Sequence, residues 1–226
     1  MKICAISDLH GYLDITIEKS DICIIAGDIF PLDIQVNDRK SKKWICGPFS
    51  EWAHSLDCDK VVFIAGNHDF LCERKDDYMH ELFPASDKVT YLNCEQYIFT
   101  SSDGQQLNIY GSPLSHKFGN WAFMDYEENL AETYKDIPYG VDILLTHDAP
   151  FGVSDVCVQS VFNNGEHIGS TALRDAIIEK NPKYNIHGHL HSSNHDCEML
   201  NNTQVYNVSV KNEHYRPVYQ PLYLNI

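Results

Sequence analysis

Five short groups of residues along the chain carry side chains that bind metal ions. They are Asp8-Leu9-His10, Gly27-Asp28, Gly66-Asn67-His68-Asp69, Thr146-His147 and Gly188-His189-Leu190-His191. Imidazole nitrogen suits Zn, Fe, Ni or Co, whereas carboxylate and amide oxygens suit Mn or Mg, so a mixed set accommodates several divalent ions. Two aspartates, an asparagine and several histidines supply enough ligands for a pair of adjacent ions. The residue types therefore predict a centre that holds two divalent metals.

Each group follows an apolar, β-branched run, and these runs must position the metal-binding side chains. They are nearly continuous in apolar character, which is typical of strands covered on both faces. They span residues 2–7, 21–26, 60–65, 141–146 and 183–187. Ligands gather beyond the carboxyl ends of strands in an α/β sheet, so we expect the five groups to meet there. Asp8 and His10 are expected to alternate on an extended backbone and thus face the same point.

The segments between these runs predict helices and a hairpin. Helical patterns cover residues 49–56, 75–83, 126–136 and 170–180, and the last has Ser170 or Thr171 as a cap and Pro182 beyond its end. Residues 96–110 resemble a hairpin that turns at Ser102-Asp103-Gly104. Segments 205–210 and 222–226 are expected to be closing strands, and the basic segment 36–47 a mobile loop. No linker or repeat interrupts the chain, so we expect residues 1–226 to form a single domain.

The order D-x-H, GD, GNH[D/E], H and GHxH resembles the calcineurin-like metallophosphoesterase superfamily, and the resemblance spans residues 8–191. Taken singly, Asp28 could be a turn residue or a helix cap, and His10 a surface histidine. Five matches in the right order are hard to obtain by chance. The resemblance implies an α/β fold of four layers, an α/β/β/α sandwich of two mixed β-sheets flanked by helices.

The resemblance also implies a role for each side chain. The implied metal ligands are Asp8, His10, Asp28, Asn67, His147, His189 and His191. Asp28 would bridge both ions, because one carboxylate has two oxygens. His189 would join Asn67 and His147 at one ion, and His191 would join Asp8 and His10 at the other. His68 would not bind metal but would point at the phosphoryl group, where it can protonate the leaving oxygen or stabilise the transition state.

The implied reaction is hydrolysis of a phosphoric ester by two divalent metal ions. Paired ions lower the pKa of a shared water and orient an in-line attack, so the nucleophile would be a metal-bridging hydroxide. Mn²⁺ is the expected ion, and Fe, Zn, Ni or Co would also suit this ligand set.

One departure from the family points to the kind of substrate. Protein phosphatases of the superfamily extend the second motif as GDxxDRG, whereas this chain has Pro31, Leu32 and Asp33 where that motif places its last three residues. The arginine that would hold a phosphomonoester is thus missing there. The chain is more similar to the small phosphodiesterase branch related to the brain and fetal-brain metallophosphoesterases. We therefore expect a phosphodiesterase for a small, nucleotide-type substrate, with His116 as a candidate substrate contact.

The amino-acid composition limits the binding partners and the cellular location that we expect for this chain. The formal net charge is −15, with 32 acidic residues against 17 lysines and arginines, which argues against nonspecific binding to nucleic acid. No apolar run approaches the roughly 20 residues of a membrane span. The eight cysteines form no CxxC pair, and no signal peptide fits before Asp8, so we expect a location in the reducing cytoplasm.

Other readings of the same residues stay open. A metal-dependent nuclease or a phosphomonoesterase would use the same centre, and a non-catalytic metal-binding scaffold could retain the architecture. The oligomeric state is open as well. The remaining histidines (54, 80, 167, 187, 195 and 214) are expected on the surface or satisfied in the core.

Overall fold

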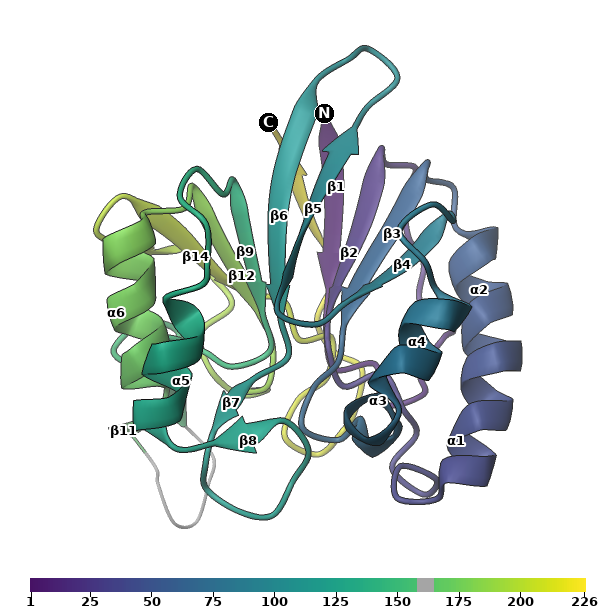
Figure 1. Ribbon diagram of the computed structural model, residues 1–226, viewed down its shortest axis with the longest axis horizontal. Helices are drawn as coiled ribbons and strands as arrows, with labels where there is room; N and C mark the ends of the chain where they lie inside the picture. Colours follow the sequence, from purple (N-terminus) through teal and green to yellow (C-terminus); the bar gives the residue numbers. More distant parts are fainter. Residues whose placement is uncertain (158–164) are drawn as a thin grey trace.

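Two β-sheets packed face to face form the centre of the computed structural model, which describes residues 1–157 and 165–226. The five-stranded sheet has the order β15-β1-β2-β3-β4, in which only β15 is antiparallel to its neighbour. Its strands are β1 (Lys2–Ile6), β2 (Ile22–Ala26), β3 (Lys60–Ile64), β4 (Val89–Leu92) and β15 (Leu222–Asn225). β15 pairs with β1 and so brings the two ends of the chain together (Figure 1).

The six-stranded sheet has the order β13-β14-β12-β9-β6-β5, with a parallel centre and an antiparallel strand at each edge. Its strands are β5 (Glu95–Thr100), β6 (Gln106–Ser112), β9 (Ile143–Thr146), β12 (Tyr184–His187), β13 (Glu198–Leu200) and β14 (Thr203–Asn207). Two short ladders lie beside the sheets and consist of β7 (Ser115–His116) with β8 (Met124–Asp125), and β10 (Val156–Cys157) with β11 (Glu166–His167).

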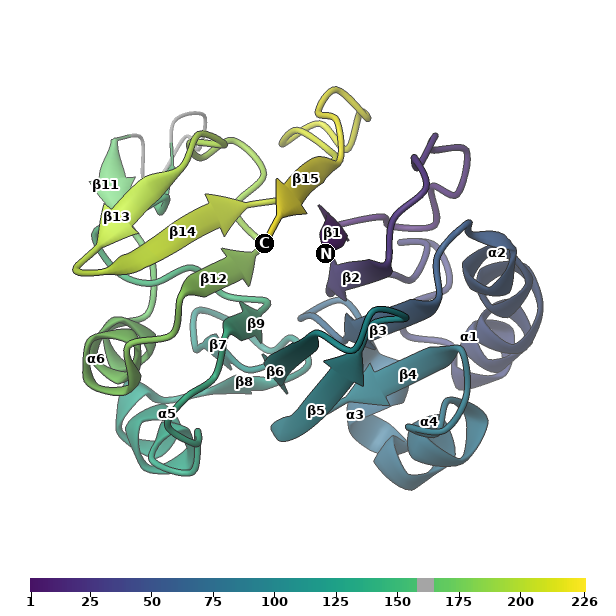
Figure 2. The same cartoon turned by 90° about the horizontal axis from the view of Figure 1, so that it is seen from above.

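Helices cover the outer face of each sheet, so the molecule has the predicted four layers (Figure 2). The helices beside the five-stranded sheet are α1 (Asp38–Trp44), α2 (Ser50–Ser55), α3 (Phe70–Arg74) and α4 (Asp76–Leu82). The six-stranded sheet is flanked by α5 (Glu127–Tyr134) and α6 (Thr171–Lys180). In the part of the chain that the structure describes, no helix is long and apolar enough to cross a membrane.

Three apolar clusters hold these layers together, and the one between the sheets explains the continuous apolar runs. Ile24 of β2, Ile64 of β3 and Ile143 of β9 are fully buried there. The alternate residues of the same strands, such as Cys23 and Phe63, face the helices in a second cluster. Both faces of each central strand are thus covered, as the sequence predicted.

Most predicted elements are confirmed, with ends displaced by a few residues. The hairpin is present as β5 and β6, with Gln96 opposite Tyr110. The side chain of Ser170 caps α6 by accepting a hydrogen bond from the N–H of Leu173 at 3.1 Å. The strand expected at 205–210 begins at Thr203 and already ends at Asn207, and β4 was not predicted.

The prediction of a loop at residues 36–47 is wrong. Asn37 caps α1 by accepting a hydrogen bond from the N–H of Lys40 at 3.1 Å, and a π-helical turn (Ile45–Phe49) containing Pro48 joins α1 to α2. The ring of Trp44 anchors this basic helix by packing against Phe30, with ring centroids 5.4 Å apart. A single cap and one aromatic anchor outweigh the run of positive charges that suggested a loop.

Candidate active site

The loops that follow β1 and β2 carry the first three predicted ligands on an unusual backbone. Asp8, His10 and Asp28 have positive φ angles of 57°, 41° and 53°, which lie in the left-handed region. Hydrogen bonds between the loops hold this conformation, with the N–H of Asp8 to the carbonyl of Gly27 at 3.0 Å and that of His10 to Asp28 at 2.9 Å. The expectation of an extended backbone at Asp8 and His10 was wrong, but tight turns still direct both side chains to one point.

One group of possible ligand atoms comes from Asp8, His10 and His191, whose donors all lie within 4.8 Å of one another. Nε2 of His191 is 3.1 Å from Oδ1 of Asp8 and 3.4 Å from Nε2 of His10. Nδ1 of His191 donates to the carbonyl of Asn212 at 3.0 Å, which fixes the ring and leaves Nε2 free to bind. The family resemblance predicted that these three side chains bind the same ion, and the structure brings their donor atoms close together.

A second group surrounds His147, which is completely buried. Its Nδ1 donates to the carbonyl of Ala26 at 2.8 Å, so Nε2 faces Oδ1 of Asn67 at 2.9 Å and Oδ1 of Asp28 at 3.4 Å. The ring of His189 lies 5.0 Å from that of His147, measured between centroids. His147 and Asn67 thus lie beside Asp28, and His189 lies beside His147; the assignment of these side chains to one ion stays a prediction.

Asp28 lies between the two groups and faces both. While Oδ1 is close to His147, Oδ2 is 3.6 Å from Nε2 of His10. Asp8 and Asp28 are almost completely buried, with 0% and 2% exposure, and no lysine or arginine pairs with them among the described residues. Two buried carboxylates surrounded by imidazoles and an amide oxygen form a donor set that suits two divalent cations.

The protonation states of three of the imidazoles, His147, His10 and His189, differ because their surroundings differ. Burial alone would lower the pKa of His147, but the charges of Asp28 and Asp8 raise it to about 10. Burial lowers the pKa values of His10 and His189 to about 4, so both are neutral at pH 7 and able to bind a metal. Burial alone would raise the pKa of Asp28, yet the neighbouring imidazoles, His147 first, hold it well below its usual range.

His68 lies beside this centre rather than inside it. Its backbone N–H donates to Oδ1 of Asp28 at 2.8 Å, and its ring packs against Trp121 with centroids 4.7 Å apart. Nδ1 of His68 is 2.6 Å from Oε1 of Gln35, so the amide oxygen accepts the Nδ1–H and Nε2 faces the centre, 4.0 Å from Oδ2 of Asp28. Gln35 was not predicted, because it lies outside every motif in the segment between β2 and α1.

Asp69 links the loop that follows β3 to the loop that follows β2 by hydrogen bonds. Its fully buried carboxylate accepts hydrogen bonds from the N–H groups of Ile29 at 3.0 Å, Phe30 at 3.1 Å and Gly66 at 2.8 Å. Burial and the charge of Asp28 raise the pKa of Asp69 to about 7, and these N–H groups oppose that rise. The sequence marked Asp69 as part of a motif but gave no indication of this role.

Glycines allow the loops to approach the ligands closely. A Cβ atom on Gly66 would collide with the carboxylate of Asp28 and would lie 2.6 Å from Cε1 of His147. A Cβ atom on Gly188 would collide with Ser7 and with the carboxylate of Asp8. Both positions therefore require glycine for a steric reason.

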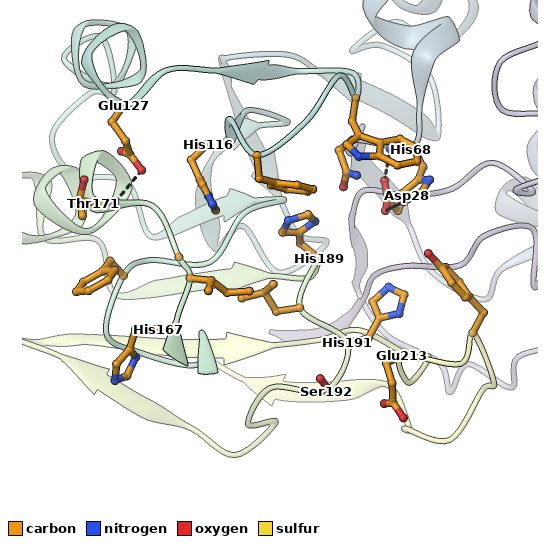
Figure 3. A pocket seen from close by; sticks show the side chains of 18 residues that line it. Asp28, His68, His116, Glu127, His167, Thr171, His189, His191, Ser192 and Glu213 are labelled. Carbon is orange, nitrogen blue, oxygen red and sulfur yellow. Dashed lines mark hydrogen bonds and ion pairs between the residues drawn. The ribbon is translucent and has the colours of Figure 1, made fainter. Parts of the chain in front are cut away.

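A cleft of about 700 Å³ opens beside this centre (Figure 3). Its wall carries Asp28, His68 and His189, together with exposed aromatic rings such as Phe118 and Trp121. None of the described lining residues is lysine or arginine. The lining also includes His116, Glu127 and His167.

Besides His68, two histidines of the cleft lie outside the set of seven predicted ligands, and each is held by a buried aspartate. His116, the predicted substrate contact, has its Nδ1 2.8 Å from Oδ2 of Asp148. His167 has its Nδ1 2.6 Å from Oδ1 of Asp155. His167 is exposed, as expected, and it also lines the cleft. Both aspartates are distant in sequence from their partners, so no local spacing indicated these pairs.

Comparison with known proteins agrees with this architecture. The model of the family described as calcineurin-like phosphoesterase matches residues 1–193. Human metallophosphoesterase domain-containing protein 1 is 28% identical, with 100% of this chain and 71% of that protein covered.

Two solved structures are similar in fold. Phosphopantetheinyl hydrolase from Mycobacterium tuberculosis has a TM-score of 0.64 at 16% identity, covering 98% of this chain and 95% of that one. A dimetal phosphatase from Danio rerio has a TM-score of 0.52 at 12% identity, covering 96% and 89%. At such identities these two structures show the fold alone, and they confirm the predicted fold class.

Proposed function

The chain belongs to the calcineurin-like phosphoesterase family and is a metal-dependent phosphoric ester hydrolase, and we propose that it is a phosphodiesterase for a small nucleotide-type molecule. The observation that supports the metal centre most directly is the position of Asp28, whose two oxygens face imidazoles of separate donor groups. The proposed ligands are Asp8, His10, Asp28, Asn67, His147, His189 and His191, with Mn²⁺ as the proposed ion. When bound, two such ions supply an activated water and neutralise the charge on the phosphoryl oxygens.

His68 is the proposed catalytic acid. Gln35 holds its Nδ1–H, so Nε2 is the nitrogen that exchanges a proton with the leaving oxygen. The ring is fixed on its other side by Trp121, which limits its rotation. Positioned in this way, His68 can deliver a proton in the transition state without reorganisation of the site.

The preference for a diester is supported by the charge of the cleft. When the phosphoryl group under attack is a monoester dianion, arginine commonly holds it, and the described lining has neither arginine nor lysine. A diester carries one negative charge and two substituents, for which the aromatic rings of Phe118 and Trp121 offer contact area. His116 is the proposed substrate contact outside the metal centre.

The proposed setting is the reducing cytoplasm, with a small phosphorylated molecule as the partner. Seven cysteines in the described part of the chain are free thiols. The net charge of −15 supports a small substrate over an extended nucleic acid, because binding along a duplex depends on lysine and arginine.

Hydrolysis of bis-p-nitrophenyl phosphate in the presence of Mn²⁺ tests this function. We expect turnover by the wild-type protein and a loss of at least a hundredfold in kcat for His68→Ala, with two ions per chain retained. His54→Ala, on the exposed end of α2, serves as the matched control and should keep full activity. Equal inactivity of wild type and His68→Ala with Mn²⁺, Ni²⁺, Co²⁺ and Zn²⁺ would refute the proposal.

A further inference from the structure

His116 and Asp148 form a fixed pair at the wall of the cleft, outside the proposed ligand set. Oδ2 of Asp148 accepts hydrogen bonds from the backbone N–H of His116 at 2.9 Å and from its Nδ1–H at 2.8 Å. Oδ1 accepts the N–H of Ala149 at 2.9 Å. The side chain of Asp148 is fully buried, whereas that of His116 keeps 19% exposure and lines the cleft. Since Nδ1 is occupied, Nε2 is the atom that His116 can offer to a ligand.

The surroundings of both side chains favour an ion pair. The carboxylate of Asp148 is fully buried and accepts three N–H groups, an arrangement that favours its charged form. Burial alone would lower the pKa of His116, but the hydrogen bond and the charge of Asp148 raise it. A protonated imidazole has two N–H donors, of which Asp148 accepts one. The second donor remains for a group inside the cleft.

The other carboxylate in this part of the cleft does not compete for that donor. Glu127 is occupied by the start of α6, where its oxygens accept hydrogen bonds from Oγ of Ser170 at 3.0 Å and from the N–H groups of Thr171 at 3.2 Å and Ala172 at 2.8 Å. The positive end of the helix further compensates its charge. Nε2 of His116 is therefore free to bind an external acceptor.

The pair lies close to the metal centre but not within it. The ring of Phe118 is 5.8 Å from that of His116 and 5.5 Å from that of the proposed ligand His189, measured between centroids. In Figure 3, His116 lies on the side of the cleft that carries Glu127, and His189 is placed between His116 and His68. A group bound by His116 is thus a part of the substrate other than the phosphoryl group under attack.

We propose that His116 and Asp148 form a subsite for a second negatively charged group of the substrate, a phosphate or carboxylate a few bonds from the scissile phosphorus. This inference rests on the proposed function and narrows its substrate class to molecules with two anionic groups. The charge-assisted hydrogen bond from Nε2–H supplies the recognition. No lysine or arginine of the described lining offers an alternative partner.

A matched pair of substrates tests the subsite. Adenosine 2′,3′-cyclic phosphate and its 5′-phosphorylated derivative share the scissile bond and differ only in a distal phosphate. We expect wild type to prefer the phosphorylated compound in kcat/KM by about 10- to 100-fold, the range of one charge-assisted hydrogen bond. In His116→Gln the ratio should approach one, and Asp148→Asn, with its metal content checked, should reduce it as well. His54→Gln should leave the ratio at the wild-type value.

A binding measurement keeps this test separate from the test of catalysis. Calorimetry should show tighter binding of adenosine 3′,5′-bisphosphate than of adenosine 3′-monophosphate, and His116→Gln should abolish the difference even if the protein proves inactive. Equal affinity of wild type for both compounds would overturn the subsite. An equal decrease in affinity for both compounds in His116→Gln would also overturn the subsite. Absence of diester hydrolysis alone would contradict the proposed function and leave the affinity comparison to decide on the subsite.

Discussion

At the scale of single residues, the proposed ligands enter metal binding from different protonation states. His10 and His189, with pKa values near 4, are neutral at pH 7 and can bind an ion without losing a proton. His147, with a pKa near 10, must release one before Nε2 can coordinate. The carboxylate of Asp28, which raises the pKa of His147, is itself a proposed ligand, so the proton on His147 occupies the place that a cation would take.

Metal affinity should therefore increase with pH. Below its pKa of about 10, His147 holds a proton that the metal displaces, so the affinity for Mn²⁺ should rise about tenfold per pH unit between pH 6 and 9. Calorimetry in two buffers with different ionisation heats would count the protons released, and we expect at least one per chain. In His147→Asn this release should fall by one. An affinity independent of pH across this range would show that His147 is already neutral.

Gln35 should act on the rate through His68. In Gln35→Ala the imidazole loses its hydrogen bond at Nδ1, and loss of one neutral hydrogen bond corresponds to about a 2- to 10-fold decrease in kcat. KM and metal content should stay unchanged, because the hydrogen bond of the Gln35 side chain goes to His68 and not to a proposed ligand. Gln35→Glu, which keeps an acceptor oxygen, should recover most of the rate. A larger effect on KM than on kcat would place Gln35 in substrate binding instead.

At the scale of elements, the site depends on where strands end and on how the following loops are fastened. The strand ends could be predicted, because each apolar run stops directly before a ligand motif, as β2 does before Gly27-Asp28. The fastening could not be predicted, since Asp69 reaches the backbone of Ile29 and Gln35 reaches His68 across the fold. Such contacts depend on three-dimensional proximity between segments that no local pattern connects.

The difference between local patterns and contacts across the fold also explains which other features could not be predicted. The pairing of His116 with Asp148 joins β7 to the loop after β9, and its sequence separation of 32 residues gives no periodic signal. The basic segment that became α1 contains one apolar anchor, Trp44, which was too weak a pattern to indicate a helix. Composition was informative about the buried strands because burial on both faces leaves a continuous apolar run.

Gly66 provides a test at this scale. In Gly66→Ala the added methyl group would displace the carboxylate of Asp28 or the ring of His147, so metal binding should weaken by at least tenfold. Gly47→Ala is a matched control, because no atom lies within 4 Å of a Cβ at that position and the residue has no positive φ. Metal content by mass spectrometry would compare the two. Full occupancy in Gly66→Ala would mean that the loop after β3 can move away without loss of the site.

At the scale of the whole molecule, the centre joins the two sheets. Asp8, His10, Asp28 and Asn67 follow strands of the five-stranded sheet, whereas His147, His189 and His191 follow β9 and β12 of the other. The apolar cluster between the sheets already fixes their relative position. Bound ions would add a second connection at the rim, so metal binding and global stability should be coupled.

Chelation should accordingly lower the melting temperature. At a free Mn²⁺ concentration about 100 times the dissociation constant, binding to the folded state adds about 2.7 kcal/mol per site. For a chain of this size, that corresponds to a decrease of roughly 5–10 °C in Tm for each site emptied, and about twice as much when both ions are removed. Scanning calorimetry with EDTA and after restoration of Mn²⁺ would measure the change and its reversibility. An identical Tm in both conditions would indicate that the ions bind without linking the sheets.

The left-handed backbone at Asp8, His10 and Asp28, which recurs at His189 with a φ of 67°, implies a trade-off between activity and robustness. Each such residue stores about 1–3 kcal/mol of conformational strain, which the rest of the fold must offset. His10 adds a buried Nδ1 without a hydrogen-bond partner. Asparagine adopts this backbone readily, so His10→Asn should leave the metal-free protein at least as stable as wild type while removing the gain in Tm from Mn²⁺. Selection for stability alone would thus replace these residues, so the strained backbone is expected only where the proposed metal centre is useful to the protein.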